Sequence, residues 1–510
     1  MMYRRIITLQ KEPLEHTQTQ SQTLRARVDR AVTWAGRIVP AAALVAIGSF
    51  FAAQQVTSPN HRSIKLVVML GIAAFMFRFD MVYAIYAFVV LFPFPTGISI
   101  ASSNLVLMTV IPMVWAVRAA STKTRLFRAT PLGAPHALFI IAYFVSLMNV
   151  ESNLALVRSL QIIWRQIACV TFFAMIVTFV DDEKRLKQIL QLMCVSVGLV
   201  MATAIVELIA PGSTIIPGWV GMGKPLSHGG ELTARVEKMR IGGALGSDAN
   251  LADFGTQLLG FMVYFALRAK NPAMKTFWFL VSVLTLVAVL STGNRGGLVG
   301  IMILFGYALY LFRRRMSFPQ KVMIVTAALA LAFAADYALS TYTYATSPIQ
   351  RLMNTEMHGV VPETRTMTWL PSLKKCLEHP FVGSGPWFEI GKGLSFQFWP
   401  HNAYLFYLQT LGLFGFGAFM WIMWRVTKMS LAFWHRTRMR DDVSDILALA
   451  HIWLVVFAVE QLGIDHQRED IYPFLVWFFF AIIVAAAGII QRRETGIEAI
   501  RLPKRFGSVV

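Results

Sequence analysis

The chain has 510 residues, of which 56% are hydrophobic and 15% are charged, and its formal net charge is +20. This composition excludes an ordinary soluble domain and is typical of a protein whose solvent is largely lipid. We therefore predict an all-α polytopic integral membrane protein.

Apolar segments long enough to cross the bilayer core, roughly 17–25 residues each, number about fourteen. The second and third are short and close together, so about twelve or thirteen crossings remain an alternative. We predict a cytoplasmic basic tail at 1–33, a single transmembrane domain at 34–490 and a cytoplasmic tail at 491–510. The segments are 34–53, 64–79, 81–96, 101–117, 134–150, 157–179, 187–210, 250–267, 275–291, 297–312, 321–340, 402–424, 444–462 and 471–490.

Cationic residues indicate the orientation. Lys and Arg concentrate in the connections 118–128, 313–321 and 425–440 and in the carboxyl-terminal tail. Because positive loops resist translocation, this pattern places both termini in the cytoplasm. Topology and attraction to anionic lipid explain much of the positive charge, so we expect membrane lipid and not nucleic acid as a partner.

Two connections on the predicted outer face are long, 211–249 and 341–401. Connections of this length are usually binding loops or lids, so we expect the site there, with a helical stretch in the second. Of the three cysteines, only Cys376 lies outside the predicted spans. Neither an internal disulfide nor a thiolate metal site is expected.

Arg158 and Arg165 lie inside the segment 157–179, seven residues apart, with Gln161 between them on the same helical face. A charge at the bilayer centre costs at least about 2.5 kcal/mol, so these side chains should face a wet cavity or polar partners. Snorkelling to the outer interface is the alternative, above all for Arg158.

The turn "LSTGNRGGLVG", residues 290–300, places Arg295 among glycines at the outer face. Glycines allow a large ligand to approach the backbone, and the positive end of the following helix suits phosphate. We therefore expect an anion site, although a plain helical hairpin would also use glycines.

The stretch 363–391 predicts a short amphipathic helix from Arg365 to Leu377, with a leucine-containing stripe, followed by the turn "GSGPW". Arg365 either reaches inward or is solvated. Farther on, His401 and Asn402 stand at the threshold of an apolar run. Asn is a good helix cap and His is common at interfaces, but a neutral imidazole at this position could also act as a base.

These motifs resemble those of the O-antigen ligase and O-antigen polymerase-like superfamily of bacterial polysaccharide assembly. The resemblance covers about 240–425 and depends on the outer-turn arginine, an Arg-x-x-x-Trp helix that ends in "HPFVGSGP", the helix start "HNAYLFYLQTLGLFG" and "MRIGGALGSDANLADFG". It implies a membrane glycosyltransferase of the C type, inverting and without cofactor or metal. Such a protein transfers a glycan from undecaprenyl diphosphate to an acceptor hydroxyl at the periplasmic side of the inner membrane.

The resemblance also implies roles for residues. His401 would activate the acceptor, and Arg295 and Arg365 would hold the diphosphate, since arginines can stabilise phosphate charge by bidentate hydrogen bonds in place of a metal. Arg158, Arg165 and Arg240 would be additional cations around the diphosphate.

A polymerase and a ligase differ in acceptor, a growing glycan against lipid A core, and both remain open. A chain-length regulator would be a partner of the polymerase. The alternative class is a transporter, such as a lipid-linked glycan flippase or a bicarbonate carrier. An inverted repeat or intramembrane charges in both leaflets would favour a transporter, and the sequence shows neither feature.

Overall fold

The computed structural model describes residues 81–91, 103–121, 128–210, 241–313, 317–342, 357–358, 361–387, 400–436, 441–463 and 471–495, with a few isolated positions between them. The chain divides into two units, one of 1–79 and 109–128 and one of 80–108 and 129–510. Helix α5 (Ser103–Ser121) runs from the second unit into the first. The segments predicted at 34–53 and 64–79 lie outside the described residues.

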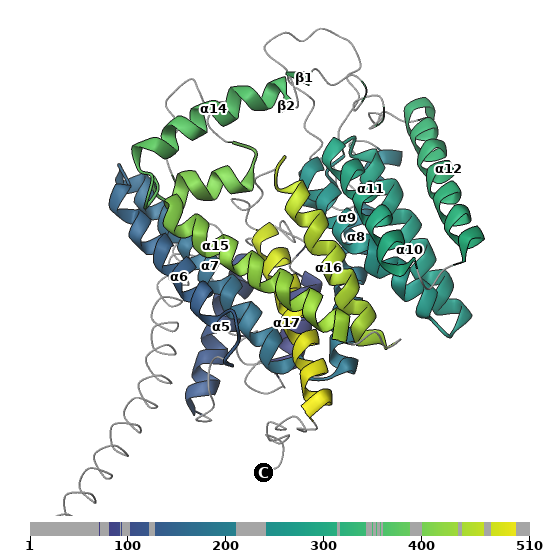
Figure 1. Ribbon diagram of the computed structural model, residues 1–510, viewed down its shortest axis with the longest axis horizontal. Coiled ribbons are helices and arrows are strands. Elements are labelled where there is room, and N and C mark those ends of the chain that lie inside the picture. The colour runs from purple at the N-terminus through teal and green to yellow at the C-terminus, as the bar shows by residue number, and fades with distance from the viewer. Residues whose placement is uncertain are drawn as a thin grey trace, which may run out of the picture. The chain divides into compact units, whose positions relative to one another are not determined.

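The second unit holds the remaining elements (Figure 1). They are α4 (Met81–Leu91), α6 (Gly133–Val145), η1 (Ser146–Asn149), α7 (Asn153–Phe179), α8 (Glu183–Ile209), η2 (Gly243–Leu245), α9 (Asp248–Arg268), α10 (Pro272–Ser291), α11 (Arg295–Phe312), α12 (Phe318–Tyr342), β1 (Met357–His358), β2 (Val361–Pro362), α14 (Glu363–Glu378), α15 (Ala403–Arg436), α16 (Asp442–Glu460) and α17 (Tyr472–Thr495). Apart from the two-residue antiparallel pair β1–β2, these elements are helical.

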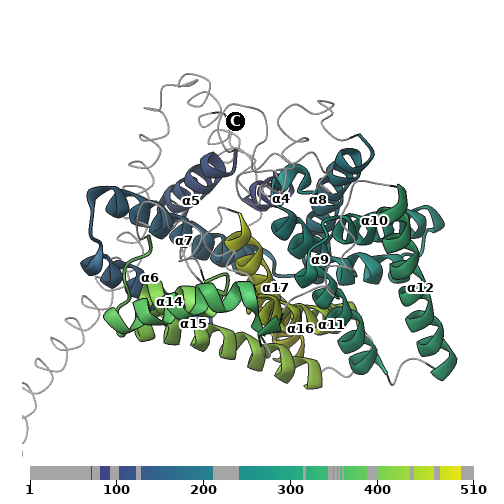
Figure 2. The same ribbon diagram turned by 90° about the horizontal axis from the view of Figure 1, so that it is seen from above.

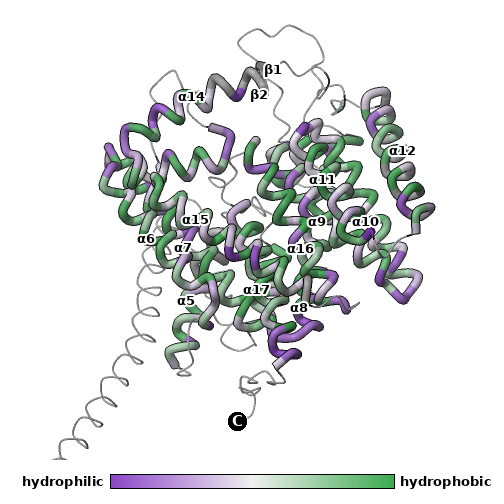
Figure 3. The backbone as a smooth tube through the Cα atoms, in the orientation of Figure 1, coloured by the Kyte–Doolittle hydropathy of each residue, from purple (hydrophilic) through white to green (hydrophobic). Residues whose placement is uncertain are grey.

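Within the described residues, seven helices are long and apolar enough to cross a membrane: α7, α8, α10, α11, α15 over Ala403–Ala432, α16 and α17. The prediction of an all-α polytopic membrane protein is confirmed. Figure 3 shows hydrophobic residues along most of these helices, whereas α14 mixes both kinds. The core helix is α17, which is apolar on all sides and buried from Tyr472 to Ala487.

Helix α9 coincides with the segment predicted at 250–267 but is not among the seven, because it carries polar residues inside the helix. It packs against α8, α10, α11 and α16, so these residues are enclosed by protein. Asp253 and Thr256 are fully buried and Gln257 nearly so.

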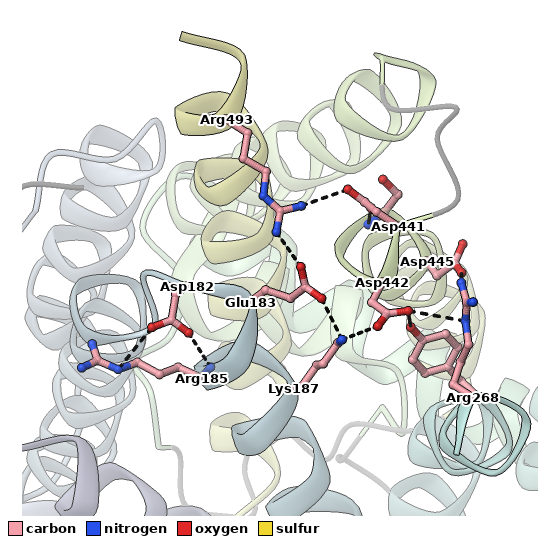
Figure 4. Close-up of polar contacts among 11 residues, drawn as sticks. Asp182, Glu183, Arg185, Lys187, Arg268, Asp441, Asp442, Asp445 and Arg493 are labelled. Atoms are coloured by element: carbon pink, nitrogen blue, oxygen red, sulfur yellow. Dashed lines mark hydrogen bonds and ion pairs between the residues drawn. The ribbon is translucent and has the colours of Figure 1, made fainter. Parts of the chain in front are cut away.

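Ion pairs join four helix ends, the starts of α8 and α16 and the ends of α9 and α17 (Figure 4). We call this the charged end. The alternation of the predicted spans requires these four ends to lie on the same side, and they do. The pairs are Arg493 with Glu183 (2.5 Å) and Asp441 (3.0 Å), Lys187 with Glu183 (2.7 Å) and Asp442, and Arg268 with Asp445 (2.6 Å).

Candidate functional site

Helix α14 lies at the opposite end of the second unit from the carboxyl-terminal end of α17, and the two views show it beside α15 (Figures 1 and 2). The sequence between them, "HPFVGSGP", does more than stop a helix. It packs into a break in α15 at Gly412, where φ is 64° and ψ is −169°. The break leaves backbone groups of α15 without helical partners, and the loop supplies them.

Four backbone hydrogen bonds form this joint. Leu413 N donates to Pro380 O (2.8 Å), Phe414 N to Phe381 O (3.0 Å), Ser384 N to Gln409 O (2.9 Å) and Gly385 N to Thr410 O (3.2 Å). Backbone meets backbone without side chains between: a Cβ at Gly412 would overlap Phe381, and a Cβ at Gly383 would overlap Thr410. This close approach of the two backbones therefore requires glycine at both Gly383 and Gly412.

His401 stands at the amino-terminal end of α15 with a left-handed backbone, φ 46°, and is half-buried. Among non-glycine residues, histidine and asparagine adopt this conformation more often than most. The next residue, Asn402, is the helix cap: its Oδ1 accepts hydrogen bonds from Tyr404 N (3.0 Å) and Leu405 N (3.1 Å). The cap that the sequence suggested is therefore present, and it belongs to Asn402 and not to His401.

The end of α16 holds the start of α15 in place. Ala403 N donates to Gln461 O (2.9 Å), Asn402 Nδ2 to Leu462 O (3.2 Å) and Tyr404 OH to Ala458 O (2.8 Å). Three bonds between the same two helix ends restrict the backbone that presents His401.

Arg365 lies in the first turn of α14 and is half-buried. One turn later, Thr368 Oγ1 is within hydrogen-bonding distance of the carbonyl oxygens of Arg365 (3.1 Å) and of Pro400 (3.4 Å). Since Pro400 precedes His401, the first turns of α14 lie against the start of α15. The structure thus brings the backbone segments of Arg365 and His401 together.

Arg295 is the first residue of α11, after a turn in which Gly293 has φ 62°. Asn294 Oδ1 caps this helix by accepting from Gly296 N (2.8 Å) and Gly297 N (3.4 Å). Two of the amides that could have received a phosphate are therefore bonded within the turn. Arg295, which is half-buried, is the charged residue of this turn.

Helix α11 lies against the end of α16 that holds α15. At Gly300 a Cβ would overlap Glu460 Oε1, so the carboxylate occupies the space beside the α11 backbone. Thr256 of α9 packs at the same place, and its Oγ1 lies 3.5 Å from Gly297 O. The starts of α11 and α15 are therefore joined through the last turn of α16.

A buried polar network beneath these ends was not anticipated from the sequence. Gln257 Nε2 donates to Glu460 Oε2 (3.0 Å) and to Tyr472 OH (2.6 Å), and Gln257 Oε1 accepts from Trp453 Nε1 (2.9 Å). Asp253, one turn before Gln257 on α9, is fully buried near this network. The available signal was Asp253 and Gln257, one turn apart in an apolar segment, with an acid inside another span.

The three remaining predicted cations have different surroundings. Arg158 is exposed, 3.4 Å from Gln161 Oε1, and its neighbour Ser159 accepts a hydrogen bond from Trp387 N after the α14 loop. Arg165 is buried about 10 Å farther along α7. It interacts electrostatically with Tyr143 and Tyr407, so it faces protein.

Arg240 and most of the connection 211–249 lie outside the described residues. In the part of the chain that the structure describes, no three His, Cys, Asp or Glu side chains form a group that could hold a metal ion.

Residues 280–420 match the family model described as O-antigen ligase, and a search of the curated proteins found no match. The matched segment includes Arg295, Arg365, His401 and the broken part of α15. It supports glycosyl transfer of the O-antigen ligase type in polysaccharide assembly. The resemblance of this chain to the O-antigen ligase-like superfamily is confirmed over these residues.

Proposed function

We propose that this protein transfers a glycan from an undecaprenyl-diphosphate donor to an acceptor hydroxyl on the periplasmic side of the bacterial inner membrane. The observation that supports this most is that the first turns of α14, which carry Arg365, lie against the start of α15, which carries His401. The last turn of α16 contacts both the start of α15 and helix α11, which begins with Arg295.

In the proposed reaction, the acceptor oxygen forms a bond to the anomeric carbon while the bond between that carbon and the diphosphate oxygen breaks. A ring nitrogen of His401 takes the proton of the acceptor hydroxyl. The electron pair of the broken bond leaves with undecaprenyl diphosphate, whose growing negative charge Arg295 and Arg365 stabilise. Attack opposite the leaving group inverts the anomeric centre, and the arginines take the place of a metal ion.

Further cations would extend the donor site. Arg158 is exposed near Trp387 and would meet the diphosphate or the first sugar. Arg165 is enclosed, so we assign it to orienting Tyr143 and Tyr407 beneath the site more than to direct contact. Arg240 completes the proposed set.

Sequence and geometry fit both a polymerase, which adds to a growing glycan alongside a chain-length regulator, and a ligase, which adds to lipid A core. In this proposal, the helix ends that carry Arg295, Arg365 and His401 face the periplasm, and the charged end and both termini lie in the cytoplasm.

Complementation of a deletion strain tests the proposal. His401→Asn keeps a residue suited to the left-handed backbone and removes the imidazole, while Arg295→Gln and Arg365→Gln remove charge with little change in size. Arg313→Gln, at the other end of α11, is the matched control. With membrane levels confirmed by blot, we expect the three site variants to lose polymer on a surface-polysaccharide gel and the control to keep it.

The gel pattern separates the two acceptors. Retention of single repeat units with loss of long glycan indicates a polymerase, and loss of all glycan from lipid A core indicates a ligase. Full activity in the three site variants would overturn the assignment and favour the transporter.

A further inference from the structure

Helix α14 has two faces of different kinds. Thr368, Ser372 and Cys376, spaced by one turn, are buried against protein, and Arg365 begins the same face. The opposite face is an apolar stripe, which we call the leucine face: Leu370, Leu373 and Leu377 are 60%, 43% and 77% exposed. An amphipathic helix normally buries its apolar side, whereas this one turns leucines outward and polar groups inward.

Exposed apolar residues also lie just after α14 and on α15, the helix that it contacts. Phe381, just beyond α14, is 70% exposed. Its carbonyl accepts the Phe414 N–H in the break of α15, and Leu413 and Phe414 are also exposed. Because α15 is one of the seven candidate spans, its exposed apolar side chains face lipid.

We infer that α14 is an interfacial helix whose leucine face lies in the outer leaflet of the membrane that α15 spans, with lipid acyl chains as its occupant. Exposed leucines in water would be a large apolar patch, but in the interface they are in contact with hydrocarbon. Lys374 is exposed one turn after Leu370, and its long stem lets the ammonium reach lipid phosphates.

The geometry gives this contact a consequence for the site. Contact between lipid and the leucine face would keep the opposite face of α14, with Arg365 and Thr368, packed against Pro400 and His401. This consequence rests on the proposed function, whereas the lipid contact itself does not.

Site-directed fluorescence tests the lipid contact in the full-length protein reconstituted in vesicles of phosphatidylethanolamine and phosphatidylglycerol. Leu373→Cys and Leu377→Cys would each be labelled with a small maleimide fluorophore, and the unsubstituted protein, whose three cysteines are buried, gives the background. Glu378→Cys is the matched control, adjacent to Leu377 but off the stripe. Quenching by spin-labelled lipid is compared with quenching by aqueous iodide.

We expect the labels at 373 and 377 to be quenched several-fold more by the lipid than by iodide, and the label at 378 to show the reverse. Quenching of 373 and 377 by iodide would place the leucine face in water and overturn the inference. Quenching by neither, with Leu377→Cys forming disulfide-linked dimers, would show that a second copy covers the face and would overturn it as well.

A second measurement addresses the consequence. The triple variant Leu370→Asn/Leu373→Asn/Leu377→Asn, at an unchanged membrane level, should reduce polymer formation at least several-fold, while the triple methionine variant should retain it. Equal activity of both triple variants would overturn the link to Arg365 and leave the quenching result standing. Quenching as expected, with His401→Asn fully active, would instead show failure of the proposed function alone.

Discussion

Asn402 links two helix ends that are 60 residues apart in the sequence, donating from Nδ2 to Leu462 O at 3.2 Å while its Oδ1 caps α15. Asn402→Ala removes both functions. We expect a loss of about 1–2 kcal/mol in stability and a strong loss of transfer, because the backbone of His401 is released.

Asn402→Asp is the matched control, since a carboxylate can still cap the helix but cannot donate to Leu462. Melting in detergent should rank wild type above Asp and Asp above Ala. If Asn402→Ala melts at the same temperature as the wild type, the cap does not contribute to stability.

Gly412→Ala should disrupt the joint between α14 and α15. The residue lies at φ 64° and ψ −169°, a region nearly exclusive to glycine, and a Cβ would overlap Phe381. The strain alone costs about 1–3 kcal/mol. Gly417→Ala, on the same helix with open space around it, should be neutral or slightly stabilising. Membrane abundance and detergent melting measure both, and equal behaviour of the two variants contradicts the joint.

Gly300→Ala should displace the Glu460 carboxylate from its place beside α11 and disturb Gln257. Overpacking of this kind costs about 1–3 kcal/mol, and it should lower transfer because α11 carries Arg295. Gly306→Ala, two turns along the same helix with nothing within 4 Å, serves as the control. The melting temperature in detergent and the amount of polymer on a surface-polysaccharide gel are measured for both variants. Normal transfer by Gly300→Ala would separate this contact from the site.

Arg493→Ala removes the pairs with Glu183 (2.5 Å) and Asp441 (3.0 Å) at the charged end. Because the side chains are partly exposed, the loss should be at most about 1 kcal/mol per pair. We expect a melting temperature lower by a few degrees at low salt, less at high salt, and unchanged transfer. As a control, Lys184→Ala removes an exposed cation from the first turn of α8, next to Glu183. Loss of transfer in Arg493→Ala would mean that the two ends are coupled.

Burial raises the pKa of the Cys376 thiol to about 11, so the reactive thiolate is scarce near neutral pH. Maleimide labelling should be slow at pH 7 and rise about tenfold per pH unit until the pH approaches that pKa. Glu378→Cys, two residues along, exposed and off the leucine face, should label rapidly at pH 7. Rapid labelling of Cys376 at pH 7, measured by mass shift, would mean that α14 leaves the protein surface.

The sequence alone determined the membrane character and the helix positions. Each apolar segment predicted from 81 onward coincides with a helix, because lipid requires long apolar stretches with satisfied backbones, although α15 runs twelve residues beyond the predicted end at 424. It also indicated Arg295, Arg365 and His401, whose neighbouring glycines and Asn402 have local structural meaning.

Only the tertiary structure decided which of these residues meet. The break at Gly412 depends on a loop that arrives from α14, the left-handed His401 is held by α16, and Gln257 finds Glu460 across about 200 residues of sequence. The outward direction of the leucine face is a further example, since periodicity identifies a stripe but not what it faces. Local propensities act over a few residues, whereas the pairing of buried polar groups and backbone breaks depends on partners that only the folded chain brings together.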